Sequence, residues 1–167
     1  ALSQATPLQL DAQYGAADLK VLSSPSMREP GVVGIWRPRL LLPEGIVQRL
    51  TPAQFRAVIA HELMHVRRRD WLHTIGEELW CAVLWFHPAA RVIAARLALA
   101  RETVVDEATI RLTRDRRAYA EALLAFATQQ PHLPGVIALI GRRQLSQRIA
   151  LIAEEEVMNR RRLTVSL

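Results

Sequence analysis

The sequence predicts a mainly helical α+β protein with a small sheet on its N-terminal side, and three observations favour this class. Short leucine-rich or β-branched runs separated by prolines occupy residues 18–50. From Thr51 the apolar residues recur at helical spacing to about residue 130. The chain has 167 residues, half of them hydrophobic, which suits one buried core. We therefore expect one domain over residues 1–167.

The segments follow in chain order. Residues 1–17 show little periodicity and predict a loose N-terminal arm. Residues 18–50 predict the small sheet, with two or three strands in the runs 18–22, 31–35 and 39–42. Residues 51–130 predict the long helices, and residues 131–167 predict one further helix followed by a tail.

The first long helix has a clear start signal. Thr51 can cap it, Pro52 suits the first helical position, and Gln54 can complete a capping box. Apolar residues spaced three or four apart follow to about Arg69, which predicts one buried stripe along this helix.

Composition restricts the classes of partner. There are 22 basic and 16 acidic residues, a net charge of +6, and every basic residue except Lys20 is an arginine. The arginines are scattered in pairs and triplets, so a solvated helical surface is favoured over an anion-binding patch. Cys81 is the sole cysteine, which excludes an intrachain disulfide, and its apolar surroundings predict a core position.

Membrane and processing signals are also limited. Arg91 and Arg96 interrupt the longest apolar stretch, so no run reaches the roughly 18 residues of a membrane span. The chain begins Ala-Leu-Ser-Gln, without an initiator methionine or a signal peptide layout. We therefore expect an excised, soluble piece of a longer protein.

The strongest chemical motif is His61-Glu62-Leu63-Met64-His65 on the predicted helix. His61 and His65 are four residues apart, so one helical turn brings both imidazoles to the same side, where they can bind one Zn²⁺ ion. Glu62 is offset by about 100° and suits a general base that acts on a water molecule. Two satisfied histidines beside a surface glutamate are the alternative interpretation.

A catalytic zinc ion normally takes three protein ligands. In one class of zinc peptidases a glycine and a third histidine follow the motif, but Arg68 and Trp71 occupy those positions here. Another class supplies a glutamate from a later helix, and Glu102 is the candidate. Asp106, one turn further on, can accept a hydrogen bond from the far nitrogen of His61 or His65.

Further motifs support a family resemblance. They are Gly34–Arg39, Leu42–Gly45, Arg67–Asp70, Trp85–Pro88 and the Glu102 to Asp106 spacing, all within residues 18–130. With the histidine motif, they resemble the peptidase domain of the BlaR/MecR-type sensor proteins of β-lactam resistance. Two positions differ, because that family often has Asn at His87 and Cys at Val105, and the last 40 residues match poorly.

The resemblance implies a minimal gluzincin (zincin-like) fold, with one zinc ion held by His61, His65 and Glu102. It also implies a domain carried between membrane helices of a parent protein, at the cytoplasmic face of the bacterial inner membrane. The implied activity is limited cleavage of a protein substrate, either the protein itself or a DNA-binding repressor, in signalling. The alternative is a zinc-stabilised scaffold or an arginine-rich nucleic-acid-binding module; direct nucleic-acid binding is disfavoured.

The remaining candidates have weaker signals. Tyr119, near the start of the next helix, is a candidate oxyanion donor, although packing explains a tyrosine there equally well. His87 precedes Pro88 and is expected to be a capping or turn residue at a helix start, whereas His73 and His132 lack metal-ligand spacing. The tryptophans at 71, 80 and 85 fit either a core or a face that touches a membrane.

Overall fold

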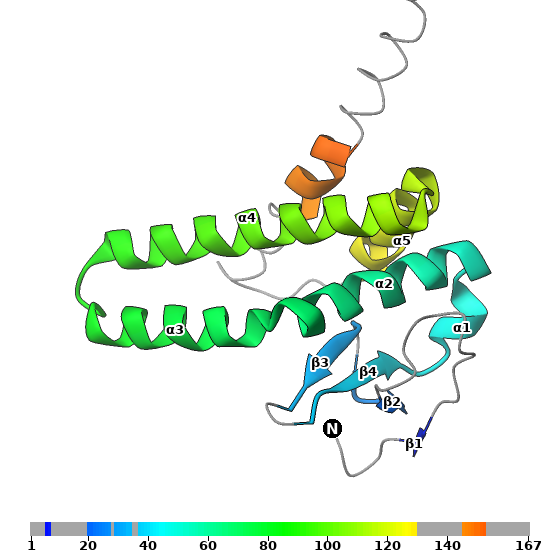
Figure 1. The fold of residues 1–167 in the computed structure, drawn as a ribbon, viewed down its shortest axis with the longest axis horizontal. Coiled ribbons are helices and arrows are strands. Elements are labelled where there is room, and N and C mark those ends of the chain that lie inside the picture. The colour runs from blue at the N-terminus through cyan, green and yellow to red at the C-terminus, as the bar shows by residue number, and fades with distance from the viewer. Residues whose placement is uncertain (1–5, 8–19, 28, 35–36, 130–144, 153–167) are drawn as a thin grey trace, which may run out of the picture.

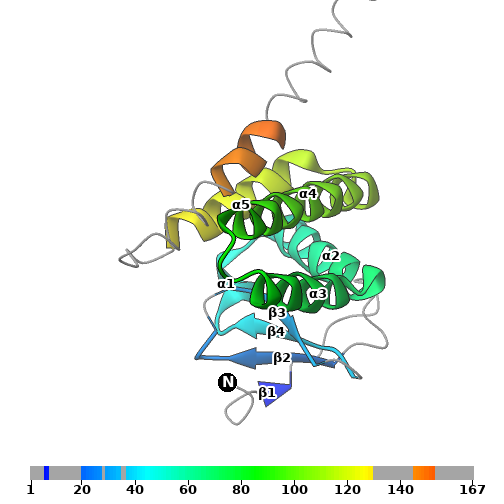
Figure 2. The same ribbon diagram turned by 90° about the vertical axis from the view of Figure 1, so that its left-hand side faces the viewer.

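The computed structural model describes residues 6–7, 20–27, 29–34, 37–129 and 145–152. A four-stranded sheet forms one layer, and α2 (Pro52–Arg68) lies over it and continues into α3 (Asp70–Val83) beyond its edge (Figures 1 and 2). A third layer is formed by α4 (Pro88–Thr113) and α5 (Arg116–Gln129). The predicted class, a mainly helical α+β protein with a small N-terminal sheet, is confirmed.

The sheet has the strand order β1-β2-β4-β3. Its strands are β1 (Thr6–Pro7), β2 (Lys20–Ser24), β3 (Gly31–Val33) and β4 (Arg39–Pro43). The two inner strands, β2 and β4, are parallel, and the outer strands β1 and β3 pair antiparallel with them. The three expected strands are present with shifted ends. The loose arm expected over residues 1–17 is corrected at Thr6 and Pro7, because these two residues pair with β2.

The core lies between β4 and α2. Leu40, Leu41 and Leu42 of β4 are at most 1% exposed, so this strand is covered on both faces. One buried cluster joins the sheet to the helices; its members are Val21, Leu40, Leu42, Ile46, Leu50, Phe55, Val58, Ile59 and Ala122. Burial of each large aliphatic side chain contributes roughly 1.5–3 kcal/mol, so this cluster fixes α2 on the sheet.

Two helices follow the sheet. After α1 (Ile46–Arg49), α2 (Pro52–Arg68) begins with the predicted capping box, in which Thr51 and Gln54 exchange side-chain to backbone hydrogen bonds. α2 ends at Arg69, whose φ of 55° is left-handed. This single residue separates α2 from α3 (Asp70–Val83), so the two helices run nearly end to end (Figure 1).

α4 (Pro88–Thr113) runs back over both α3 and α2, and α5 (Arg116–Gln129) packs against α2. His87 caps α4 by accepting the Ala89 N–H at Nδ1, as predicted. Residues 145–152 are helical, within the stretch where a further helix was expected. None of the described helices is long and apolar enough to cross a membrane.

Candidate metal centre

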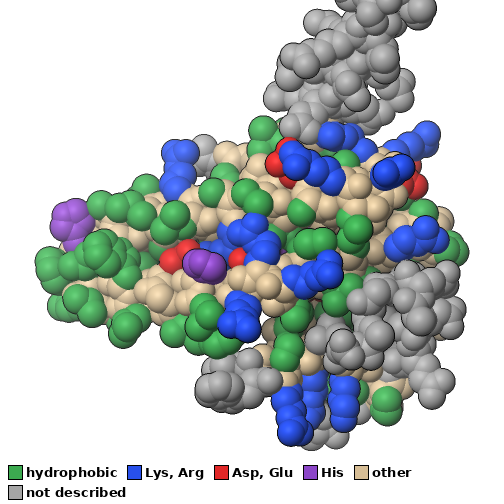
Figure 3. All heavy atoms as spheres, viewed as in Figure 1, with side chains coloured by type: hydrophobic (Ala, Val, Ile, Leu, Met, Phe, Trp, Pro, Cys, Tyr) green, Lys and Arg blue, Asp and Glu red, His purple; other side chains and the backbone are tan. Residues whose placement is uncertain are grey.

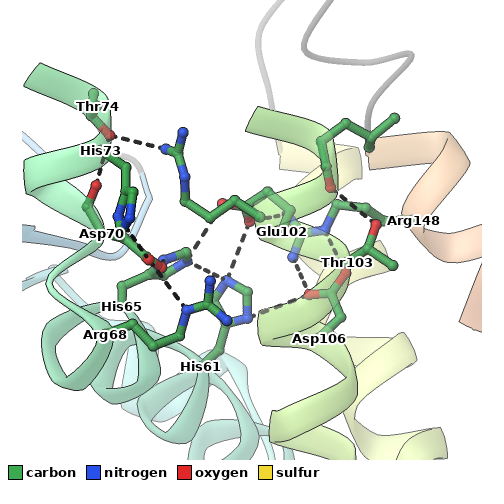
Figure 4. Close-up of polar contacts among 12 residues, drawn as sticks. His61, His65, Arg68, Asp70, His73, Thr74, Glu102, Thr103, Asp106 and Arg148 are labelled. Carbon is green, nitrogen blue, oxygen red and sulfur yellow. Dashed lines mark hydrogen bonds and ion pairs between the residues drawn. The ribbon is translucent and has the colours of Figure 1, made fainter. Parts of the chain in front are cut away.

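The candidate centre begins with the histidines of α2. His61 and His65 project from the same side of the helix, and their Nε2 atoms are 3.2 Å apart. His61 is buried and His65 is half-buried. The capping box and the packing of α2 on the sheet hold this helix in register, so both rings face α4 (Figure 4).

Glu102 of α4 completes the cluster. Its Oε2 lies 3.5 Å from Nε2 of His61, and its Oε1 lies 3.5 Å from Nε2 of His65. The three groups offer ligand atoms within 4.8 Å of one another. Ligands bound to a tetrahedral zinc ion at about 2.0–2.1 Å are separated by roughly 3.4 Å. The donor set of two imidazoles and a carboxylate, and its spacing, therefore fit zinc.

A carboxylate orients the His65 ring. Nδ1 of His65 lies 2.8 Å from Oδ2 of Asp70, and Oδ1 of Asp70 accepts a hydrogen bond of 3.2 Å from Nε of Arg68. Asp70 is buried at the start of α3, directly after the left-handed Arg69. With Nδ1 of His65 donating to Asp70, Nε2 keeps its lone pair for a metal ion. The sequence reasoning did not assign Asp70 to the site, although its position five residues after His65 offered a signal.

Tyr119 of α5 orients the His61 ring. Its hydroxyl lies 2.8 Å from Nδ1 of His61 and donates a hydrogen bond to Oδ1 of Asp106, while Nδ1 of His61 is 3.4 Å from the same carboxylate oxygen. Burial and the Asp106 charge raise the pKa of Tyr119, so its hydroxyl stays protonated and available as a donor. The direct hydrogen bond expected from a histidine to Asp106 stays a prediction, and in this structure the Tyr119 hydroxyl links Asp106 to His61.

The oxyanion role expected for Tyr119 stays a prediction, and the contacts favour another role. The hydroxyl is engaged on the Nδ1 side of His61, away from the Nε2 atoms that face Glu102. A group fixed on that side positions the imidazole.

Arg148, from the helical residues 145–152, closes the polar cluster. Its Nε donates to Oδ2 of Asp106 at 2.8 Å, and its Nη2 donates to Oδ1 at 2.6 Å. Nη2 also lies 3.2 Å from the Tyr119 hydroxyl, and Nη1 lies 3.0 Å from Oε2 of Glu102. Sequence reasoning missed Arg148, because one arginine among many gave no signal and its partner Asp106 is 42 residues away.

The two glutamates of the site have opposite pKa shifts. Burial raises the pKa of Glu62, although the neighbouring His61 and His65 lower it in part. Burial also acts to raise the pKa of Glu102, but the hydrogen bond with His61 and the Arg148 charge outweigh it and lower the value to about 2. Glu102 is thus held as a carboxylate suited to a metal ion, whereas Glu62 is held closer to its protonated form.

Two clefts meet at these residues. One, of about 460 Å³, is lined mainly by residues of α2, α4 and α5 and by Arg148. The other, of about 430 Å³, is lined mainly by residues of β3, α2, α3 and α4. Glu62, His65 and Glu102 line both. A substrate that crosses from one cleft to the other would pass the candidate centre.

Two further histidines, His73 and His87, lie in the described part of the chain. His73 is exposed and lies 3.9 Å from Asp70, and His87 is the cap of α4. His132 lies outside the described residues.

Comparison with known proteins gives the family of this chain. A family model described as BlaR1 peptidase M56 matches residues 8–152. The chain is 27% identical over 118 residues to the regulatory protein BlaR1 of Bacillus licheniformis, covering 69% of this chain and 19% of that protein. It is 23% identical over 151 residues to the methicillin resistance mecR1 protein of Staphylococcus aureus, covering 87% of this chain and 26% of that protein. The chain thus spans about a quarter or less of the length of these curated relatives.

Proposed function

Because this chain belongs to the BlaR1 peptidase M56 family, we propose that it is the zinc-dependent endopeptidase domain of a longer membrane sensor protein. One observation carries the proposal: His61, His65 and Glu102 converge at the spacing of zinc ligands. His61, His65 and Glu102 would hold one ion, and Glu62 would act beside it.

When bound, the zinc ion would polarise a substrate carbonyl and lower the pKa of a water molecule toward about 7. Glu62 accepts the proton of that water and later donates it to the amine that leaves. Because burial raises the pKa of Glu62, this carboxylate is suited to take up and then return a proton near neutral pH.

The surrounding residues hold the ligands in place. Asp70 fixes the tautomer of His65, and the Tyr119 hydroxyl does the same for His61 with Asp106 behind it. Arg148 neutralises the buried Asp106 carboxylate, which would otherwise carry an unpaired charge.

The substrate would bind as an extended chain along β3. This strand is at the edge of the described sheet, and Val32 and Gly34 line the second cleft beside Glu62. An added strand would gain backbone hydrogen bonds at this edge, while its side chains enter the clefts. Such recognition suits an exposed loop of a protein substrate.

The curated relatives suggest the wider role. One is named as a regulatory protein and the other as a methicillin resistance protein. We extend to this chain a limited cleavage in signalling, either of the parent protein or of a DNA-binding repressor, at the cytoplasmic face of the bacterial inner membrane. The remainder of the parent protein would supply membrane helices.

A single variant tests the proposal. Glu62→Gln should bind about one zinc ion per chain and lower peptide cleavage by roughly 10²–10⁴-fold, because the general base is lost while the ligands remain. Glu107→Gln, an exposed carboxylate on α4, is the matched control and should cleave normally. Cleavage should also stop on chelation and return with zinc.

The alternative is a metal-stabilised scaffold or nucleic-acid-binding module that never cleaves. A scaffold requires the ligands but has no use for Glu62 at the junction of two clefts. Unchanged cleavage by Glu62→Gln, or a wild-type chain without zinc, would refute the proposed mechanism. Steeply salt-dependent binding of duplex DNA without any peptidase activity would favour the alternative.

A further inference from the structure

An apolar surface occupies the closed end of the hairpin formed by α3 and α4. Leu79 and Val83 at the end of α3 are 66% and 65% exposed, and Trp85 and Phe86 in the connection are 78% and 65% exposed. We call these four residues the hairpin tip. Hydrophobic side chains gather over this end of the molecule (Figure 3), and Trp80, Val92 and Ile93 extend the surface along both helices.

The tip is exposed although the hairpin itself is well packed. Cys81 and Ala90 are buried between the two helices, and the Cys81 thiol contacts the Ala90 carbonyl oxygen at 3.7 Å. The Trp85 and Phe86 rings meet edge to face, with centroids 6.2 Å apart. The apolar side chains therefore form an ordered outer surface, which corrects the core interpretation for Trp85 and for the half-exposed Trp80.

The backbone on either side of Trp85 and Phe86 is hydrogen-bonded within the hairpin. The Leu84 N–H donates to the Trp80 carbonyl at 2.9 Å, and the His87 N–H donates to the Leu84 carbonyl at 2.9 Å. The Ala89 N–H donates to His87 Nδ1, and the Ala90 N–H donates to the His87 carbonyl. These four N–H groups stay paired on transfer out of water, whereas the Trp85 and Phe86 N–H groups have no such bond in the described structure. This pattern suits the hydrated interfacial region of a bilayer rather than its hydrocarbon core, where every backbone group must be paired.

The charges around the tip indicate its partner. Between Glu78 and Glu102 the sequence has no acidic residue, whereas Arg91 and Arg96 are exposed on α4. A second copy would bring the same positive surface against itself, which is unfavourable. An anionic lipid surface complements the arginines, and tryptophan is favoured where lipid headgroups meet hydrocarbon.

We propose that the hairpin tip inserts into the interfacial region of an anionic lipid bilayer, with Trp85 and Phe86 deepest and Arg91 and Arg96 at the headgroups. α4 is continuous from Pro88 to Glu102, a separation of 14 residues. At 1.5 Å per residue, this insertion holds the candidate centre about 20 Å along α4 from the tip.

Vesicle binding by the 167-residue chain tests this proposal. The chain should bind vesicles of phosphatidylcholine with 30% phosphatidylglycerol in a sedimentation assay, and bind pure phosphatidylcholine about tenfold or more weakly. Trp85→Ser/Phe86→Ser should weaken binding by at least about tenfold. Leu112→Ser/Leu124→Ser is the matched control, because these aliphatic side chains are 58% and 53% exposed away from the tip. The control should bind normally.

Two double variants of equal net charge test how much the arginines near the tip contribute to vesicle binding. Arg91→Gln/Arg96→Gln should bind anionic vesicles roughly 10- to 30-fold more weakly, whereas Arg56→Gln/Arg111→Gln, with the same net charge, should change little. Trp85 also reports directly on insertion. Its emission should shift to shorter wavelength with vesicles, and Trp85→Phe should bind but lose most of that shift.

Three outcomes would overturn the proposal. They are no binding to either vesicle, binding that the tip substitutions leave unchanged, and self-association without vesicle binding that Trp85→Ser/Phe86→Ser abolishes. Self-association of this kind would show that the hairpin tip forms contacts between two copies of the chain instead. Glu62→Gln should bind vesicles as strongly as the unsubstituted chain, so this test is independent of peptidase activity.

Discussion

Replacement of Asp70 by Asn tests how the candidate centre holds its ligands. The substitution keeps the size of the side chain and removes its charge. Asp70 accepts hydrogen bonds through both oxygens, from Nδ1 of His65 and from Nε of Arg68. An asparagine has one oxygen, so only one of these donors keeps an acceptor.

The expected loss follows from these two bonds. A hydrogen bond to a charged group contributes about 1.5–3 kcal/mol, whereas a neutral one contributes about 1 kcal/mol. If the amide oxygen stays on His65, the charge-assisted part of that bond is lost, which is the difference between these two values, about 0.5–2 kcal/mol. Because 1.4 kcal/mol corresponds to a tenfold change, zinc affinity should fall roughly 2- to 30-fold.

Competition with a chromophoric chelator at fixed pH measures this affinity. Glu107→Gln is the control for the lost carboxylate, since Glu107 is exposed and pairs with Arg111. Circular dichroism should show that the Asp70→Asn chain is folded. In cleavage assays kcat should fall more than KM rises, because Asp70 contacts the proposed zinc ligand His65 and not the substrate. Unchanged zinc affinity in a folded Asp70→Asn chain, with strong loss in His65→Ala, would refute the orienting role.

Three further substitutions are expected to act through named contacts, and urea unfolding of the metal-free chain measures the stability change of each. Tyr119→Phe removes the hydroxyl between His61 and Asp106, so stability should fall by about 1–2 kcal/mol and zinc affinity several-fold. Arg148→Met leaves the buried Asp106 carboxylate without its cation and should lower stability by about 3 kcal/mol. The double variant Arg148→Met/Asp106→Asn should recover part of this stability, and a further loss of stability in it would contradict the pairing. Gly34→Ala should lower stability by about 1–3 kcal/mol, because Gly34 has φ +95° and an added Cβ would lie 2.8 Å from the Arg37 carbonyl oxygen.

Local signals made much of α2 predictable. The capping box at Thr51 and the spacing of His61 and His65 depend on residues within one or two helical turns, so they can be read from the sequence alone. The pairing of Glu102 with these histidines depended on chemical elimination, and the structure brings the three groups together.

Long-range contacts account for what the sequence did not predict. Arg148 and Asp106 are 42 residues apart, and nothing in the local pattern distinguishes Arg148 from other arginines. The exposure of Trp80 and Trp85 depends on how α3 and α4 pack, because helical spacing alone fits a buried face and an exposed face equally.

The two histidines of the candidate centre are therefore oriented in different ways, one by a residue close in sequence and the other by residues from distant elements. His65 is oriented by Asp70, five residues away, so this ring can be fixed as soon as α2 and the start of α3 form. His61 is oriented by Tyr119, 58 residues away, and behind it by Asp106 and Arg148 from two further elements. Because Glu102 also contacts Arg148, substitutions in residues 145–152 should alter His61 and Glu102 while leaving His65 fixed. We therefore expect zinc affinity to depend on the docking of this distant helix, whereas the contact between Asp70 and His65 should not depend on it.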